Sequence, residues 1–293
     1  MSGKLFKNGT HPTAPIKARL AIEVQTALID KIKDAFPDNE CFGLGSTGHK
    51  RLDDYNNDLD IGVQAKDVDE LYEMIHKVFS DNETVVSKTF YIVSMKQPYL
   101  DDDETKYVSV DFILVNNPEY TRFRYYCPNY ANGESRYKVG TKIMFVGNIL
   151  NHCIDHYNDD RTINYKLLFT PVGLDLEACD LINHTYVDER ITDDWHDIAN
   201  MLFDDGCFDD FMTVETLWAA IHSDRFKYKD RLKEIEMSFF LESYFKEWEE
   251  QVMPEDFELT YWTVSQIREA YRPYKKMRYI NSLLDKAYDY KMK

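Results

Sequence analysis

The chain has 293 residues, 44% of them hydrophobic, and a formal net charge of −17. This length allows two domains, and no segment approaches the ~20 apolar residues of a membrane-spanning helix. The acidic charge disfavours a long non-specific nucleic-acid interface but does not exclude a local basic patch. The N-terminus lacks the apolar core of a signal peptide, and the five scattered cysteines form no Cys-x-x-Cys pair, so we expect a cytoplasmic protein with no zinc, no disulfides and no membrane partner.

The first part of the chain predicts a small sheet with helices on one face. Residues 1–15 contain two glycines and two prolines and predict an irregular N-terminal arm. After this arm, apolar spacing predicts a helix over 16–35, a short strand ending near Leu44, a strand over 58–64, a helix over 67–80, and strands over 84–96 and 107–115. This order is typical of a compact mixed sheet, and we assign it to a domain of residues 16–118.

The character of the sequence changes after Pro118. Residues 119–138 are aromatic and predict a loop. Helical spacing recurs over 141–157, 192–204, 213–222, 228–250 and 263–290, with room for a hairpin near Lys166–Leu176. We therefore expect an α+β protein whose second domain, residues 119–293, is mostly helical.

Two aspartates separated by one residue stand out in the first domain. Asp58 and Asp60 lie on a predicted strand, where alternate side chains point to the same face. Two adjacent carboxylates repel each other unless a cation lies between them, and magnesium, often carried with a nucleoside triphosphate, is the usual cation. Just before them, Gly45-Ser46 predicts a strand-to-helix turn whose N–H groups and hydroxyl can hold phosphates.

A third aspartate lies in the most strand-like segment of the chain. Asp111 is the single charge inside the β-branched and aromatic run Tyr107–Val115. A buried carboxylate is costly unless it is paired or binds a metal, so Asp111 is predicted to join Asp58 and Asp60. Three such carboxylates can hold two metal ions roughly 3.5–4 Å apart.

Other interpretations of these motifs fit less well. The glycines at 43, 45 and 48 spell G-x-G-x-x-G, but no crossover helix fits before the next strand, and no Lys-Ser or Lys-Thr completes a Walker loop. A calcium loop beginning at Asp54 needs glycine and glutamate where the chain has Leu59 and Ala65. A solvated acidic loop does not explain the apolar neighbours of Asp60.

Gly45-Ser46, Asp58-x-Asp60 and Asp111 together resemble the motifs of the polymerase-β-type nucleotidyltransferase superfamily, over about residues 17–115. The resemblance implies that Asp58 and Asp60 bind two Mg²⁺ ions, for which Mn²⁺ could substitute. It also implies that Asp111 binds the catalytic ion, and that Gly45 and Ser46 hold the triphosphate. Asn57 stands where many members have serine. The implied second domain covers the nucleotide and receives the acceptor.

Several basic residues are weaker candidates for phosphate contacts. Lys50 follows the Gly-Ser turn and Lys142 is at the start of the first helix after the sheet, and both are predicted to bind nucleotide. Arg136 and Lys138 are slightly less favoured candidates for the same role. The alternative interpretation of each residue is an exposed charge on a helix surface with no ligand. His152 and His156 have the i, i+4 spacing of metal ligands but no third ligand, so we interpret them as ordinary core or surface histidines.

The predicted reaction is transfer of a nucleoside monophosphate from an NTP to an acceptor hydroxyl, with release of pyrophosphate. Residues 268–293 hold eight basic against three acidic residues among five tyrosines, a composition that suits unstacked RNA. This slightly favours an RNA or tRNA 3′ end as acceptor, with a protein or a small molecule left open. The alternative from another class is a non-catalytic binding or assembly module that keeps the fold.

Overall fold

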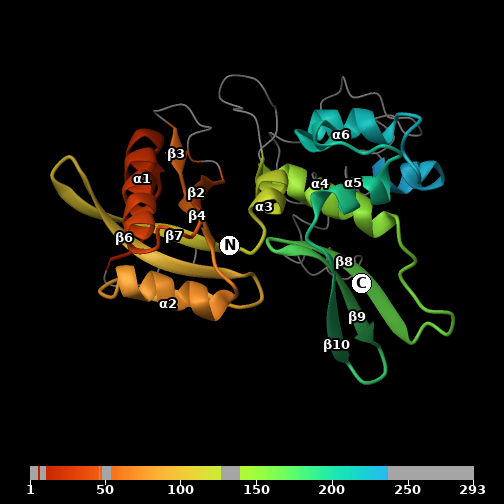
Figure 1. Ribbon diagram of the computed structural model, residues 1–293, viewed down its shortest axis with the longest axis horizontal. Coiled ribbons are helices and arrows are strands. Elements are labelled where there is room, and N and C mark those ends of the chain that lie inside the picture. The colour runs from red at the N-terminus through yellow and green to blue at the C-terminus, as the bar shows by residue number, and fades with distance from the viewer. Residues whose placement is uncertain (1–5, 7–10, 46, 48–53, 127–138, 237–293) are drawn as a thin grey trace, which may run out of the picture.

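The computed structural model describes residues 6, 11–45, 47, 54–126 and 139–236. The first part of the chain forms a five-stranded sheet in the order β2–β4–β7–β6–β5 (Figure 1). Its strands are β2 (Cys41–Leu44), β4 (Asp58–Gln64), β5 (Thr84–Ser87), β6 (Ile92–Asp101) and β7 (Glu104–Val115). Only β4 and β7 pair in parallel within this sheet, so the predicted mixed sheet is confirmed.

Two helices cover one face of this sheet. α1 (Ala18–Ala35) and α2 (Val68–Val78) pack in one hydrophobic core with alternate residues of the central strands. Those strand residues include Leu59 and Ile61 of β4 and Val110 of β7. Because strand side chains alternate between faces, the residues between them, including the three aspartates, belong to the opposite face.

A short ribbon lies beside the main sheet. β1 (Ile16–Lys17) pairs antiparallel with β3 (Tyr55–Asn56), just before the strand that carries Asp58. Ala14 N–H donates to the carbonyl of Tyr107 in β7, so the residues before β1 run along the sheet. The chain that precedes α1 is thereby placed near the start of β4.

The single strand predicted over 84–96 is wrong. The structure divides this segment into β5 and β6, which pair as an antiparallel hairpin. Tyr91 has a φ of 57° in the turn between them, and its N–H donates to the carbonyl of Lys88. A left-handed residue reverses the chain, and a tyrosine gives little sequence signal for that conformation.

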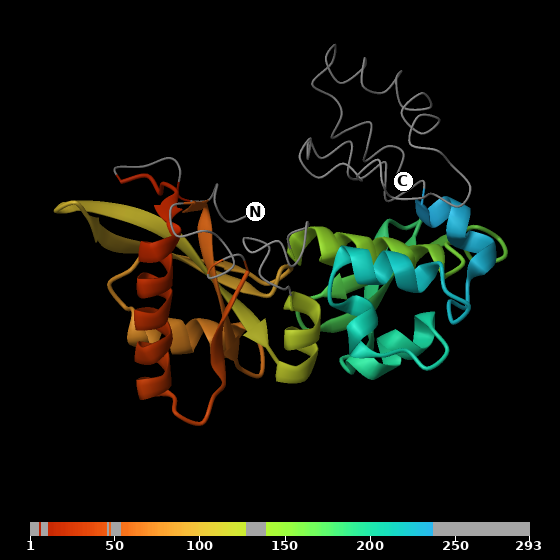
Figure 2. The ribbon, with the colours of Figure 1, turned by 90° about the horizontal axis from the view of Figure 1, so that it is seen from above.

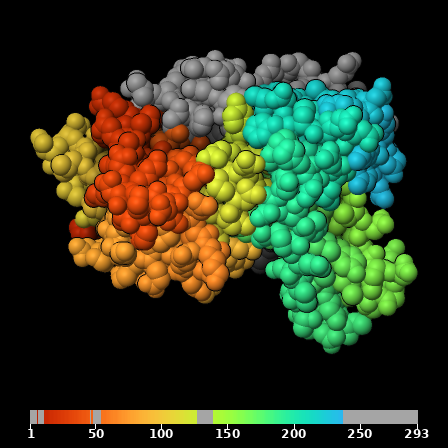
Figure 3. Space-filling view, viewed as in Figure 1, coloured from red at the N-terminus to blue at the C-terminus, as the bar shows by residue number. Residues whose placement is uncertain are grey.

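The later part of the chain contains a second sheet as well as helices. β8 (Ile163–Thr170), β9 (Gly173–Asp180) and β10 (Thr185–Thr192) form an antiparallel sheet in the order β10–β9–β8. The hairpin near Lys166–Leu176 is confirmed with longer strands, whereas β10 was not predicted. Its residues are almost all exposed, and Figure 3 shows this sheet projecting from the body of the molecule.

The helices of this part share a separate hydrophobic core. They are α3 (Pro118–Tyr125), α4 (Val139–His152), α5 (Trp195–Leu202) and α6 (Val214–Ile221), with 3₁₀ turns at Phe208–Phe211 and Lys229–Arg231. The loop predicted over 119–138 is therefore wrong for its first residues, which form α3. The rest of that loop, the helix at 263–290 and the end of the helix at 228–250 lie outside the described residues. None of the helices in the described ranges has the length and apolar character that crossing a membrane demands.

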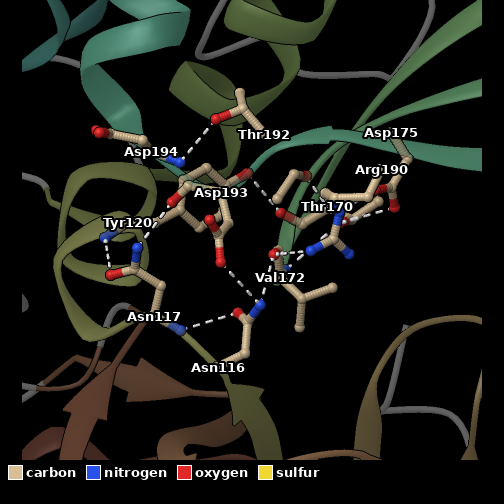
Figure 4. Close-up of polar contacts among 11 residues, drawn as sticks. Asn116, Asn117, Tyr120, Thr170, Val172, Asp175, Arg190, Thr192, Asp193 and Asp194 are labelled. Atoms are coloured by element: carbon tan, nitrogen blue, oxygen red, sulfur yellow. Dashed lines mark hydrogen bonds and ion pairs between the residues drawn. The ribbon is translucent and has the colours of Figure 1, made fainter.

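Helix α3 connects the two parts, and both ribbon views place it between them (Figures 1 and 2). Asn117 caps α3 by accepting from Glu119 N–H, and its Nδ2 donates to the carbonyl of Asp193 at 2.9 Å. Asn116 Nδ2 donates to the carbonyl of Val172 at 3.0 Å, as Figure 4 shows. The end of β7, the strand of Asp111, is thus tied to the second sheet.

Candidate functional site

The structure brings the three predicted aspartates onto neighbouring strands. Asp60 of β4 stands directly opposite Asp111 of β7 in the parallel ladder, and Asp58 lies two residues earlier in β4. All three occupy the sheet face opposite α1 and α2. Asp58 and Asp60 are half-buried, whereas Asp111 is only 5% exposed. Carboxylates that are far apart in the sequence therefore become one local cluster.

The charges of this cluster act on each other. The pKa of Asp60 is raised well above its usual value, chiefly because its carboxyl group is removed from water, and further by the negative charges of Asp58 and Asp111. Asp60 therefore holds a proton more tightly than an ordinary aspartate. A cation near these carboxylates would reverse that preference, because opposite charge favours the ionised form.

Gly45 makes close contact with this cluster. Its φ is 69°, a left-handed conformation that glycine adopts readily, and a Cβ at this position would overlap Asp60 Oδ2. Ser46 and Lys50 lie outside the described residues. Thr47, which follows Ser46, is 9% exposed, and its hydroxyl has no hydrogen-bond partner in the described part of the chain. The backbone at Gly45 thus lies directly against the Asp60 carboxylate.

Ser94 is a member of the site that was not predicted from the sequence. It lies on β6 opposite Asp111, is 2% exposed, and its Oγ donates to Asp111 Oδ1 at 2.6 Å. Hydrogen bonds to an ionised acceptor are shorter and stronger than neutral ones, which suits a carboxylate held away from water. The available signal was a serine inside the apolar run Ile92–Met95, the same kind of interruption that marked Asp111.

Gln25 fixes the strand of Asp60 from the helical side. Its Nε2 donates to the backbone carbonyl of Asp60 at 2.7 Å, and its side chain is 8% exposed. The amide packs so closely against Gly43 that a Cβ at residue 43 would lie 2.8 Å from Gln25 Oε1. A glutamine inside a helical stripe gave no sequence signal for this role.

Tyr125, at the end of α3 in the second part of the chain, has a pKa that depends on the charges of the aspartate cluster. Burial raises its pKa; Arg124 lowers it, while the charges of Asp60 and Asp111 raise it further. Arg124 is fixed by hydrogen bonds of 3.2 and 3.1 Å to the carbonyl of Phe169, and its guanidinium lies 4.6 Å from the Tyr125 ring centroid. Helix α3 therefore ends in a tyrosine whose pKa is raised in part by the charges of Asp60 and Asp111.

Lys142 occupies a different environment from the one predicted. Its side chain is 2% exposed, and its ammonium group donates to the carbonyls of Phe123 and Tyr126 at the end of α3. A cation at a helix C-terminus stabilises the helix, so this geometry gives Lys142 a structural role, and its binding of nucleotide stays a prediction. Arg136 and Lys138 lie outside the described residues.

The two histidines four residues apart do not share a helix face. His152 Nδ1 contacts the carbonyl of Asn148 at 2.9 Å inside α4, whereas His156 follows the helix and contacts the carbonyl of Tyr165 at 3.2 Å. Each histidine has a separate hydrogen-bonding role, as the interpretation of core or surface residues requires.

The donor chemistry of the cluster suits a hard divalent cation. Carboxylate oxygens are the ligands that Mg²⁺ and Mn²⁺ accept, and a cation would compensate the negative charges of Asp58 and Asp111 that act on Asp60. As they stand, no three His, Cys, Asp or Glu side chains in the described ranges are arranged as a ready ligand set. Mutual repulsion favours rotamers that keep carboxylates apart, so a cation would have to draw these side chains together.

A comparison of the sequence with protein-family models and with curated proteins finds no match. The function is therefore inferred from the residues and their geometry.

Proposed function

We propose that this protein is a metal-dependent nucleotidyltransferase of the polymerase-β type. The observation that carries the proposal is the register of β4 and β7, which aligns Asp60 with Asp111 and leaves Asp58 on the same face. The left-handed Gly45 beside Asp60 supports it, because a turn of small residues next to acidic ligands can accept a triphosphate.

In this proposal Asp58 and Asp60 would hold two Mg²⁺ ions, and Asp111 would share the catalytic one. Bound magnesium would lower the pKa of the acceptor hydroxyl and neutralise charge on the leaving group. The acceptor oxygen forms a bond to the α-phosphorus of the NTP, and the bond from that phosphorus to the bridging oxygen breaks. Pyrophosphate leaves, and the proton of the hydroxyl passes to solvent. Gly45, Ser46 and Thr47 would hold the β- and γ-phosphates.

The acceptor is proposed to be an RNA 3′ end. The basic, tyrosine-rich residues 268–293 carry this part of the proposal, and they lie outside the described residues. A protein hydroxyl and a small molecule are the competing acceptors, and ATP, GTP, CTP and UTP all remain candidate donors. Incubation with α-labelled NTPs and a tRNA pool separates the acceptors, because the label appears in RNA, in protein or in a small product.

The reaction is tested by replacing Asp111. Asp111→Asn keeps the shape of the side chain but removes its charge, so we expect label transfer and pyrophosphate release to be abolished while the melting transition is retained. Asp188→Asn, on the exposed strand β10, is the matched control and should retain wild-type turnover. Near-normal turnover by Asp111→Asn would exclude the proposed chemistry. If the wild-type protein transfers no label from any of the four NTPs to any acceptor class, the non-catalytic binding or assembly module becomes the favoured function.

A further inference from the structure

Two buried serines lie near Asp111 on the same sheet face, and only one of them bonds to it. Ser94 on β6 is the register partner of Asp111 and donates to Asp111 Oδ1 at 2.6 Å. Ser109 on β7 is two residues before Asp111 and is fully buried, and its hydroxyl has no hydrogen-bond partner among the residues that the structure describes. The same sheet face thus carries one buried serine that bonds to Asp111 and, among the described residues, one that does not.

The bond from Ser94 constrains the orientation of the Asp111 carboxylate. A carboxylate rotates about its Cβ–Cγ bond through a broad range of angles, because this torsion has no sharp staggered wells. A donor fixed on the neighbouring strand at 2.6 Å removes that freedom. Ser94 itself is 2% exposed and sits between the core residues Val93 and Met95, so its own position is determined by the sheet.

We infer that Ser94 is a positioning residue that holds the carboxylate of Asp111 in the orientation needed to bind the catalytic cation. This inference rests on the proposed function and adds a residue to it. Partners that hydrogen-bond to metal-ligating carboxylates orient them, and their removal typically costs about 10–100-fold in metal affinity or activity. If Ser94 had only a structural role, its replacement would lower the melting temperature but leave cation binding unchanged.

The test compares Ser94→Ala with Ser109→Ala. Each removes one buried hydroxyl from the same face, but only Ser94→Ala breaks a bond to Asp111. We expect Ser94→Ala to lower kcat by about 10–100-fold with little change in the KM for NTP, and to weaken Mn²⁺ binding to a similar extent. Ser109→Ala should match the wild type in both. Mn²⁺ binding is followed by electron paramagnetic resonance of the free ion, which needs no turnover.

A conservative replacement completes the design. Ser94→Thr keeps the hydroxyl and suits a strand, so it should restore Mn²⁺ binding and kcat toward wild type. If Ser94→Ala does not melt cooperatively, Ser94→Cys replaces it, since a thiol has nearly the same shape but is a weak donor. Ser94→Cys is then expected to show the same losses while keeping the fold.

The outcomes separate this inference from the reaction itself. Active wild-type protein with equal behaviour of the Ser94 and Ser109 variants would overturn the role of Ser94 and leave the function standing. Inert wild-type protein whose Mn²⁺ binding is weakened by Ser94→Ala alone would overturn the function and support the positioning role. Wild-type protein that binds no Mn²⁺ would overturn both.

Discussion

At the scale of single residues, the site depends on two close contacts with its carboxylates. Ser94 contacts Asp111 from the neighbouring strand, and Gly45 contacts Asp60 from the turn that ends β2. One contact needs a hydroxyl and the other needs the absence of a side chain.

Gly45→Ala is expected to damage both stability and the site. A left-handed alanine costs about 1–2 kcal/mol, and its Cβ would push Asp60 Oδ2 out of place. Urea unfolding and Mn²⁺ binding should therefore both be weakened. The control is Gly140→Ala near the start of α4, where a Cβ meets no atom of the described residues within 4 Å, so neither property should be weakened. Unchanged Mn²⁺ binding in Gly45→Ala would show that the contact with Asp60 has no consequence.

At the scale of elements, α3 is the helix that connects the first sheet, which carries the aspartates, to the second sheet. It begins directly after β7, is held to the second sheet by Asn117 and Arg124, and ends at Tyr125, which feels the charges of Asp60 and Asp111. Tyr120 adds a hydrogen bond from its hydroxyl to the carbonyl of Thr170 at 2.8 Å (Figure 4).

Asn117→Ala tests how firmly α3 is held. Loss of an N-cap costs about 0.5–2 kcal/mol, and here the bond to the Asp193 carbonyl is lost as well. Asp67→Ala, which removes the cap of α2 without a contact of this kind, is the matched control. We expect the larger loss in free energy of unfolding for Asn117→Ala, measured by urea titration. An equal loss in both variants would show that the bond to Asp193 adds nothing.

The elements that could be predicted from the sequence are those whose patterns are local. The helices at 16–35 and 67–80 and the strand at 58–64 follow from regular apolar spacing, and the structure places α1, α2 and β4 there. The division of β5 from β6 depends on a left-handed tyrosine, and β10 is an exposed edge strand with a weak alternation. α3 was missed because its eight residues include two arginines and little apolar pattern.

The predictable part of the candidate site was its acidic set. A charge inside an apolar strand is unusual enough to identify Asp60 and Asp111 from sequence alone. The hydrogen-bond partners of these aspartates were not predictable in the same way. Ser94 and Gln25 reach Asp111 and Asp60 from a strand and a helix whose register only the fold determines. Lys142 shows that a basic residue at a plausible position in the sequence can have another partner. Its ammonium group donates to the backbone carbonyls of Phe123 and Tyr126.

At the scale of the whole molecule, the residues that the structure describes form two hydrophobic cores, which polar contacts of Asn116 and Asn117 help to join. One core lies between the first sheet and its helices, and the other lies among α3–α6 and the second sheet. Val172, in the turn between β8 and β9, packs in the first core although its neighbours belong to the second. The two cores are therefore interlocked at this turn, and we expect a single cooperative melting transition for the described part of the chain.

Stability should depend on pH through His222. Its Nδ1 meets the carbonyl of Trp218 at 2.7 Å and its Nε2 meets buried Glu236 at 2.8 Å, so both ring nitrogens face acceptors. Burial lowers the pKa of His222, but these bonds outweigh it and the pKa is raised. The resulting stabilisation is complete below the ordinary histidine pKa of about 6.5 and is lost as pH rises through the raised value.

His222→Gln isolates this contribution. At pH 6 the variant should lose about 1–3 kcal/mol of unfolding free energy, because a charged donor to Glu236 is removed, and the loss should shrink toward pH 9. His76→Gln, at an exposed position of α2, serves as the control. A deficit that is the same at pH 6 and pH 9 would show that His222 is not charged in the folded protein.

Asp58, Asp60 and Asp111 are proposed to form a magnesium-dependent nucleotide site. The most direct measurement is thermal unfolding of wild-type protein and of Asp58→Ala with each of the four NTPs, with and without Mg²⁺. A ligand at 100 times its Kd stabilises by about 2.7 kcal/mol, which is a readily measured shift. We predict stabilisation by at least one NTP that requires both Mg²⁺ and Asp58. Stabilisation by none of the four, or stabilisation that persists in Asp58→Ala, would contradict this claim.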